Sequence, residues 1–372
     1  MVVMKVLLVN SADQWGGGET HVYDLAIGLK AKGIEVTVAC RSESALHRRM
    51  QDIHMPCIVL PLLNSIDFYS VYKLAKFVSR QKIDIIHAHL ARDYWLCIMA
   101  TVCSLQVKVV LTRHVLFLLK NSIFHKNLLS RVSKIICVSQ ETKQVLMKHG
   151  SIAPAQLQVI PNAIKHIHVS HVEITKEALG IHKGNIGIGV FGSIEEIKGQ
   201  QDFIEMAHLV HKEHPETKFY IVGSAKNINY VNNVKKSVEQ YGLGKYVVFT
   251  DHRDDAVSVM RAMDIVVSTA KQDAFGLVIL EAMSQGRPVV AYQTQGAKEI
   301  VGNGSEAVLV EVSNYHSLAE NVLKLVLDDK LRRKLGESGQ TLVKKQYNIE
   351  IMVDKTIELY DNVCRHHQED KE

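Results

Sequence analysis

Short runs of apolar, largely β-branched residues recur along the chain, and longer stretches with helical spacing lie between them. The runs are residues 4–9, 34–40, 83–89, 107–112 and 133–139 in the first half, and 186–193, 218–224, 246–253, 264–270 and 287–293 in the second. Short apolar strands that alternate with helices form βαβ units, whose helices cover both faces of a parallel sheet. The sequence therefore predicts an α/β fold with two doubly wound, Rossmann-like domains.

A break separates the two series of strands. Residues 159–185 contain a proline, several histidines and no strong periodicity, so we expect a hinge there. The predicted domains are 1–165 and 166–345, followed by a helix and tail at 346–372 that we expect to pack back toward the first domain. Residues 1–165 hold 20 Lys or Arg and 10 Asp or Glu, a net charge of +10, and the rest of the chain has a net charge of −5. This asymmetry indicates two domains with different partners.

The sequence gives no sign of a membrane-spanning or secreted protein. No segment approaches the roughly 18 apolar residues that a span needs. The first apolar run, Val6 to Val9, is too short for the core of a signal peptide. The six cysteines show no regular spacing, which is typical of reduced thiols. We therefore expect a cytoplasmic protein.

In doubly wound sheets, ligands bind where strands end and helices begin. The first such loop holds Gly16, Gly17 and Gly18 before a predicted helix. Glycines let a backbone approach a ligand closely, and helix amides favour a phosphate. The loop lacks the G-x-G-x-x-G dinucleotide fingerprint. A phosphate-binding loop and a plain strand-to-helix turn both remain open.

A second loop places Lys198 before Gly199 at an expected helix start. An ammonium group there can reach a diphosphate as a mobile point charge. The alternative is an ordinary solvated lysine.

The third loop, "DAFGLVILEAM", carries two acids around an apolar run. A helix that begins near Phe275 and Gly276 directs the free amides of residues 276–278 at an anion. Asp273 then lies outside the helix and Glu281 lies within it, where a carboxylate can accept hydrogen bonds from ribose hydroxyls. The alternative is an N-cap aspartate and a surface glutamate. The apolar neighbours of Glu281 weaken that alternative, because an unpaired acid among them is costly.

Histidines end two strands of the first half. His87 and His89 share one face of a strand end, a spacing that can bind metal, but the sequence suggests no third ligand. We therefore interpret them as polar lining. His114 also ends a strand, and a structural role and a catalytic role both remain open for it.

Together these loops resemble the retaining GT-B glycosyltransferases of family 4, which contain the glycosyltransferase group 1 domain. In the first half the motifs are "GGGE" at 16–19, "LAIGLKAKGIEVTV", "IIHAH", "LTRH", "CVS" and "VIPNAI", and in the second Lys198-Gly199, "IVGSA", the acid pair at 273 and 281, and "GAKEIV". No single motif is decisive, but their order along nearly the whole chain is specific. The resemblance implies the GT-B fold, in which two Rossmann-like domains face each other across a cleft.

The resemblance also implies a set of roles. The first domain binds the acceptor and the second binds a nucleotide-diphospho-sugar, without metal or other cofactor. The implied catalytic residues are His114, Asp273 and Lys198. The implied donor-binding residues are Gly16, Gly17, Gly18, Ser193, Lys198, Gly223, Arg253, Phe275, Gly276, Leu277, Val278 and Glu281. Among these, Glu281 corresponds to the ribose ligand, and Lys198 with the amides of 276–278 to the diphosphate ligands.

The sequence departs from the family pattern at four positions. Ser193 replaces the arginine that accompanies the lysine, which removes a fixed charge from the leaving phosphate. Asp273 replaces the first glutamate, and Ala163 and Ala297 replace glycines. We expect an active enzyme nonetheless, with Arg253 as one cation that could compensate for Ser193.

A basic, apolar stretch at 113–134 contains five Lys or Arg and no acid. Such a stretch favours contact with an anionic membrane surface, through Arg113, Lys120, Lys126 and Arg131. The alternative is a core-facing helix with a solvated basic back. Nucleic acid is a weaker interpretation, because no binding motif accompanies the charge.

The expected function is transfer of a sugar from a UDP-sugar to a glycolipid or surface-polysaccharide acceptor, by an enzyme peripheral to the inner face of the membrane. One alternative is a soluble small-molecule glycosyltransferase or nucleotide-sugar epimerase. A second is a catalytically weak scaffold of the same fold. A nicotinamide dehydrogenase is disfavoured by the missing fingerprint.

Overall fold

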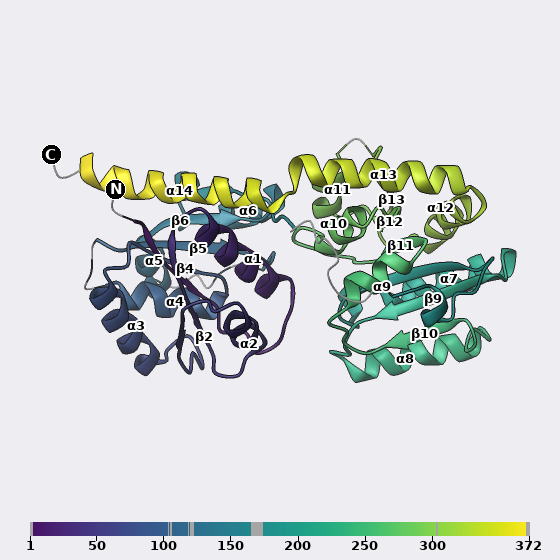
Figure 1. The fold of residues 1–372 in the computed structure, drawn as a ribbon, viewed down its shortest axis with the longest axis horizontal. Helices are drawn as coiled ribbons and strands as arrows, with labels where there is room; N and C mark the ends of the chain where they lie inside the picture. Colours follow the sequence, from purple (N-terminus) through teal and green to yellow (C-terminus); the bar gives the residue numbers. More distant parts are fainter. Residues whose placement is uncertain are drawn as a thin grey trace. The chain divides into compact units, whose positions relative to one another are not determined.

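The computed structural model describes residues 3–369, except 103, 105, 118, 120–122, 165–173 and 303. The chain divides into two compact units, which we call unit 1 (residues 1–165 and 349–372) and unit 2 (residues 166–348). Each unit is a parallel sheet with helices on its faces (Figure 1).

Unit 1 has a seven-stranded parallel sheet in the order β3-β2-β1-β4-β5-β6-β7. Its strands are β1 (Lys5–Val9), β2 (Glu35–Cys40), β3 (Cys57–Val59), β4 (Ile85–Ala88), β5 (Lys108–Arg113), β6 (Val132–Cys137) and β7 (Leu157–Val159). Its helices are α1 (Gly17–Ala31), α2 (Ala45–Asp52), α3 (Phe68–Gln81), α4 (Ala91–Ala100), α5 (Ile123–Leu129), α6 (Gln140–Met147), the 3₁₀ turn η1 (Pro154–Gln156) and α14 (Ile349–Glu369).

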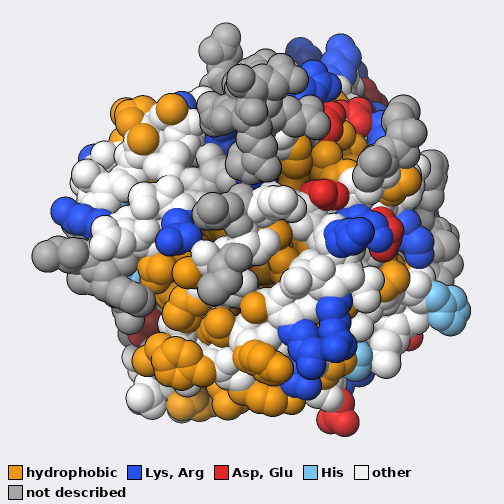
Figure 2. All heavy atoms as spheres, turned by 90° about the vertical axis from the view of Figure 1, so that its left-hand side faces the viewer, with side chains coloured by type: hydrophobic (Ala, Val, Ile, Leu, Met, Phe, Trp, Pro, Cys, Tyr) orange, Lys and Arg blue, Asp and Glu red, His pale blue; other side chains and the backbone are white. Residues whose placement is uncertain are grey.

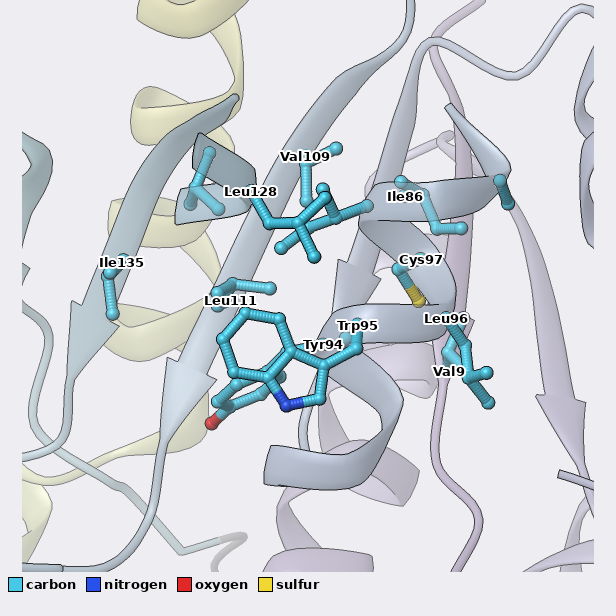
Figure 3. Packing of buried hydrophobic residues seen from close by; sticks show 14 of the residues in the cluster. Val9, Ile86, Tyr94, Trp95, Leu96, Cys97, Val109, Leu111, Leu128 and Ile135 are labelled. Carbon is cyan, nitrogen blue, oxygen red and sulfur yellow. The ribbon is translucent and has the colours of Figure 1, made fainter. Parts of the chain in front are cut away.

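The sheet of unit 1 is buried on both faces because successive side chains of a strand alternate. Leu7 of β1 belongs to a core shared with α3, α4 and α5, whereas Leu8 belongs to a core shared with α1, α2 and α14. Figure 3 shows part of the first core, where Trp95 and Tyr94 of α4 lie beside Leu111 and Val109 of β5.

Unit 2 has a six-stranded parallel sheet in the order β10-β9-β8-β11-β12-β13. Its strands are β8 (Ile186–Phe191), β9 (Thr217–Val222), β10 (Val247–Thr250), β11 (Ile265–Ser268), β12 (Val289–Tyr292) and β13 (Val308–Val310). Its helices are α7 (Gln200–Glu213), α8 (Ile228–Gln240), α9 (Ala256–Ala262), α10 (Leu277–Ser284), α11 (Gln295–Val301), α12 (Tyr315–Leu327) and α13 (Asp329–Gln346), with 3₁₀ turns η2 (Glu177–Leu179) and η3 (Glu196–Lys198).

The C-terminal helix α14 is part of unit 1 and packs against α1. Gly28 allows this contact, because a Cβ there would lie 2.4 Å from a methyl group of Val353. Tyr360 is fully buried, and its hydroxyl lies 2.6 Å from Nδ1 of His87 on β4. The final helix therefore completes the core of a unit whose other elements precede it by almost two hundred residues.

The ten strands predicted from the sequence are confirmed, and so is the doubly wound α/β class. Three strands were not predicted: β3, β7 and β13, each of three residues at a sheet edge. The expected hinge falls partly on residues 165–173, which lie outside the described residues. No helix in the described part of the chain is long and apolar enough to cross a membrane.

Candidate functional site

Two residues predicted as separate site residues form an ion pair in unit 2. Lys198 follows β8, Asp273 follows β11, and Nζ of Lys198 donates to Oδ2 of Asp273 at 3.0 Å. β8 and β11 are parallel neighbours in the sheet, so their carboxyl ends bring these loops together. About a quarter of each side chain is exposed, which leaves both groups accessible to a ligand.

The backbone around Lys198 explains the glycine that follows it. Gly199 has a φ of +68°, which a residue with a side chain rarely adopts. A Cβ there would also lie 2.3 Å from the carbonyl oxygen of Thr269. The Thr269 hydroxyl donates to the Lys198 carbonyl at 2.8 Å. These contacts fix the loop after β8 against the end of β11.

Helix α10 begins as the sequence predicts. Gly276 is its N-cap, with a φ of +98°, and the helix starts at Leu277. The amides of 276–278 precede the first intrahelical bond, so they are available to an anion. Gly296 allows close packing against the residue before the helix start, because a Cβ at position 296 would lie 2.7 Å from the carbonyl oxygen of Phe275. Glu281 lies one turn inside the helix and is half-buried.

The expected basic partner of Lys198 is absent at position 193. The Ser193 hydroxyl instead donates to the carboxylate of Glu195, which also lies 3.5 Å from Nζ of Lys226. The hypothesis that Arg253 compensates gains no support. Its guanidinium donates two hydrogen bonds of 2.7 Å to the Asp255 carboxylate, and these raise the pKa of Arg253. The charge of Arg253 is therefore already paired with that of Asp255.

The loop after β9 lies close to the loop after β8. Gly223 has a φ of +151°, and a Cβ on it would lie 2.0 Å from the carbonyl oxygen of Gly192. A single bridge joins Ile194 to Ala225. Gly223 therefore permits a backbone approach that no other residue would allow.

In unit 1 the glycine loop opens α1. Gly16 is the N-cap and Gly17 the first helical residue. Glu19 is buried and accepts a hydrogen bond of 3.1 Å from the side-chain amide of Asn10, which follows β1. The glutamate of the GGGE motif thus anchors the loop to the strand that precedes it.

An open pocket of about 620 Å³ lies beside this loop. Its lining is Ala12, Asp13, Gln14, Glu19, Leu90, Ala91 and Arg92. Arg92 follows β4 and donates to the Ser11 hydroxyl and carbonyl. Arg92 was not predicted from the sequence, although it lies just beyond a predicted strand, where ligand-binding residues are expected.

Four histidines of unit 1 lie together at the ends of β4 and β5. His87 is accounted for: its ring nitrogens lie 2.6 Å from the Tyr360 hydroxyl and 2.7 Å from the Thr112 hydroxyl. His89 and His114 stack at 5.8 Å between ring centroids, and His21 from α1 lies 4.8 Å from His114. Among the described residues, neither ring nitrogen of His89 has a hydrogen-bond partner.

The sequence suggested no further ligand beside His87 and His89, but the fold brings two more histidines close to His89. Ring nitrogens of His21, His89 and His114 lie within 4.8 Å of one another. His21 was not predicted from the sequence, where its only signal was its place two residues after the GGGE motif. Nitrogens around a tetrahedral zinc ion lie about 3.3 Å apart, so a metal would require these rings to close in.

Burial keeps these imidazoles neutral. It lowers the pKa of His21 to about 4, against a smaller opposing effect from a hydrogen bond with Asn162. Burial also lowers the pKa values of His89 and His114 well below 6.5. A neutral imidazole can donate one hydrogen bond and accept another.

We expect unit 1 to lose stability as the pH falls from 6.5 toward 4. Across this range the unfolded histidines bind protons that the folded ones exclude, so stability rises with pH. For His21 the shift from 6.5 to about 4 corresponds to roughly 3 kcal/mol. Urea unfolding followed by tryptophan fluorescence reports unit 1, because both tryptophans, Trp15 and Trp95, lie in it.

The variant His89→Asn removes one of the buried imidazoles, so the stability of unit 1 should fall less between pH 6.5 and pH 4 than it does in the wild type. The matched control, His182→Asn, alters an exposed histidine of unit 2 and should leave the pH dependence unchanged. If the stability of unit 1 depended on pH equally in the wild type and in His89→Asn, buried neutral His89 could not be a cause of that dependence.

The basic stretch at 113–134 differs from the expected amphipathic surface. Arg113 is only 3% exposed and donates to the Phe117 carbonyl, so it cannot meet a membrane as predicted. Helix α5 is short, and its Leu128 and Leu129 are buried in the core. Lys126 and Arg131 are exposed, and Lys120 lies outside the described residues.

Comparison with known proteins agrees with this architecture. Residues 15–166 match the model of the Glycosyltransferase Family 4 family, and residues 172–342 match that of Glycosyl transferases group 1. An uncharacterized glycosyltransferase of Methanocaldococcus jannaschii is 28% identical over 93% of this chain and 95% of its own.

Two further comparisons involve proteins with described ligands or reactions. The UDP-Gal:alpha-D-GlcNAc-diphosphoundecaprenol alpha-1,3-galactosyltransferase of Escherichia coli is 24% identical over 89% of this chain and 90% of its own. The crystal structure of HepE from Anabaena with UDP and glucose superposes with a TM-score of 0.83 at 22% identity, over 96% of this chain and all of HepE. The chain therefore belongs to the family 4 (group 1) glycosyltransferases and has the GT-B fold.

Proposed function

We propose that this protein transfers a sugar, with retention of anomeric configuration, from a UDP-sugar to a glycolipid or surface-polysaccharide acceptor. The observation that carries the proposal is the pairing of Lys198 with Asp273 beside the start of α10. A cation and a set of free amides at one sheet edge form a binding site for a diphosphate.

In unit 2, the diphosphate binds to Lys198 and to the amides of 276–278. These groups stabilise the negative charge that develops on the leaving phosphate, and as fixed donors they need little reorganisation. Glu281 accepts hydrogen bonds from the ribose hydroxyls. Asp273 both positions Lys198 and offers a carboxylate to the sugar.

In unit 1, the acceptor binds near the glycine loop and the histidine cluster. Gly16 and Gly17 let the backbone approach the donor phosphate, and His114 contacts the donor sugar. The guanidinium of Arg92, which lines the pocket beside the glycine loop, then binds acceptor groups. HepE with bound UDP and the diphosphoundecaprenol-dependent relative support the choice of donor and acceptor class.

A thermal-shift screen of UDP-, GDP- and ADP-sugars tests the donor. Saturation by a UDP-sugar at about 100 times its Kd should stabilise the protein by about 2.7 kcal/mol and raise the melting temperature by several degrees. GDP- and ADP-sugars should shift it little. A response to none of the three classes would overturn the proposal, and a response to GDP- or ADP-sugars alone would overturn the choice of UDP.

A further inference from the structure

The histidine cluster of unit 1 contains one ring with both nitrogens hydrogen-bonded and three rings with free nitrogens. Both nitrogens of His87 have partners in the protein. In contrast, Nδ1 of His21, both ring nitrogens of His89 and Nε2 of His114 are buried without a hydrogen-bond partner among the described residues. Buried polar atoms nearly always have a partner, so three neighbouring imidazoles of this kind indicate a site for a ligand from outside the chain.

The three rings are attached to neighbouring elements of one sheet. His21 lies on α1, His89 follows β4, and His114 follows β5. Strands β1, β4 and β5 are adjacent, and the His89 amide donates to the carbonyl of Val9 on β1 at 3.2 Å. One ring nitrogen of each of the three histidines lies within 4.8 Å of the others. The sheet therefore brings three nitrogen ligands from distant parts of the sequence to one point.

The spacing of these nitrogens is close to that of a metal site. A tetrahedral zinc ion requires them to approach one another by at most about 1.5 Å, from 4.8 Å to about 3.3 Å. The χ2 torsion of histidine has a broad distribution, so the rings can turn at little cost while the backbone stays in place.

Neighbouring groups hold two of the rings. The His21 ring forms a hydrogen bond with Asn162, which is buried. The ring of His87 lies 4.2 Å from that of His89 and is itself hydrogen-bonded through both nitrogens. In metal sites, a hydrogen bond to the histidine nitrogen that does not bind the metal orients the ring. Asn162 fits this role for His21.

The kind of ligand atom selects the metal. The three groups are all imidazoles, without a carboxylate or a thiolate among them. Imidazole nitrogen suits zinc, whereas magnesium and calcium prefer oxygen ligands. Three protein ligands leave the fourth position of a tetrahedral zinc ion open. His114 is only half-buried, so an ion can enter from its side of the cluster.

Exposed histidines would compete with this cluster for zinc. Among the described side chains on the face in Figure 2, histidines appear only in small, separate areas. A single exposed imidazole supplies one ligand, whereas the cluster supplies three, so zinc should prefer the cluster.

We propose that His21, His89 and His114 form a zinc-binding site, and that zinc bound there inhibits sugar transfer. The inhibition rests on the proposed function, in which His114 contacts the donor sugar, because an ion on this ring excludes that contact. Zinc binding itself is independent of the reaction. The family resemblance implies transfer without metal, so the ion acts as an inhibitor and not as a cofactor.

Calorimetric titration of the metal-free protein with zinc chloride tests the site. The wild-type chain should bind about one zinc ion at this cluster. His21→Asn and His89→Asn should each weaken binding at least about 100-fold, because loss of even an outer partner of a ligand costs about 10–100-fold. Asn162→Ala removes such an outer partner and should weaken binding by about 10–100-fold.

The matched control is His208→Asn/His211→Asn, which removes two histidines about one turn apart on α7 of unit 2. It should bind zinc like the wild type. Zinc should raise the melting temperature of the wild type and the control, but not that of His21→Asn or His89→Asn. Melting without zinc shows which variants fold, and either cluster variant that folds decides the question. No zinc binding by the wild type, or wild-type affinity in the cluster variants, would overturn the proposal.

UDP release measured with and without zinc tests the inhibition. Zinc should inhibit the wild type and the control, and excess chelator should restore the rate. Inhibition of His21→Asn should require at least about 100-fold more zinc. Zinc bound by the nucleotide would instead inhibit all variants equally, and that result, or zinc binding without inhibition, would overturn the inhibitory role. If the metal-free protein transferred no sugar, the proposed function would fail, while the titration would still decide the zinc site.

Discussion

Lys198→Ala should lower kcat/KM for sugar transfer by about 10²–10³-fold. The change removes the cation that faces the leaving diphosphate, and groups with this function contribute on that scale. It also leaves the Asp273 carboxylate, now without its 3.0 Å partner, beside a phosphate of like charge. Donor titration and UDP release by the wild type and the variant measure the effect.

A double variant separates charge from chemistry. Lys198→Ala/Asp273→Ala removes both members of the pair, so donor affinity should recover partly relative to Lys198→Ala alone, while kcat stays low. Lys271→Ala is the control, because Lys271 also follows β11 but its ammonium pairs with Asp202 at 3.2 Å. Wild-type donor affinity and turnover in Lys198→Ala would show that the Lys198–Asp273 pair has no part in donor binding.

Tyr360→Ala should destabilise unit 1 by about 3–5 kcal/mol, because it deletes a fully buried aromatic side chain and leaves a cavity. Tyr360→Phe should cost about 1–2 kcal/mol, since it leaves a nitrogen of buried His87 without its partner. Both tryptophans lie in unit 1, so tryptophan fluorescence during urea unfolding measures the change.

The control is Tyr347→Ala, which removes a buried tyrosine from unit 2. It should leave the midpoint of the fluorescence transition, which reports unit 1, unchanged. Circular dichroism, which reports both units, should show that unit 2 unfolds at a lower urea concentration. An unchanged fluorescence midpoint in Tyr360→Ala would show that α14 does not stabilise unit 1.

The predictable part of the fold was the part with strong local patterns. Buried parallel strands read as apolar runs, so the ten longer strands were found. The edge strands β3, β7 and β13 have only three residues each, too few to set a pattern. The start of α10 was predicted because Gly276 and the acids around it mark a helix N-terminus in the sequence itself.

The site predictions that were missed or wrong depended mostly on contacts between residues that are distant in the sequence. Nothing in the sequence near His89 indicates that the ring of His21, from α1, will lie beside it. Nor does it indicate that the Tyr360 hydroxyl will form a hydrogen bond with His87. Arg253 and Asp255 are only two residues apart in the sequence, yet whether they pair depends on the conformation of their loop. Arg113 was predicted to lie on the surface because it opens the basic stretch at 113–134, but it ends a buried strand.

The most direct test is a crystal structure of the protein with UDP. We predict hydrogen bonds of about 2.7–3.1 Å from the diphosphate to the amides of Leu277 and Val278 and to Nζ of Lys198, with the ribose hydroxyls on Glu281. UDP bound elsewhere, or with its phosphates away from α10, would contradict the assignment of the donor site to unit 2.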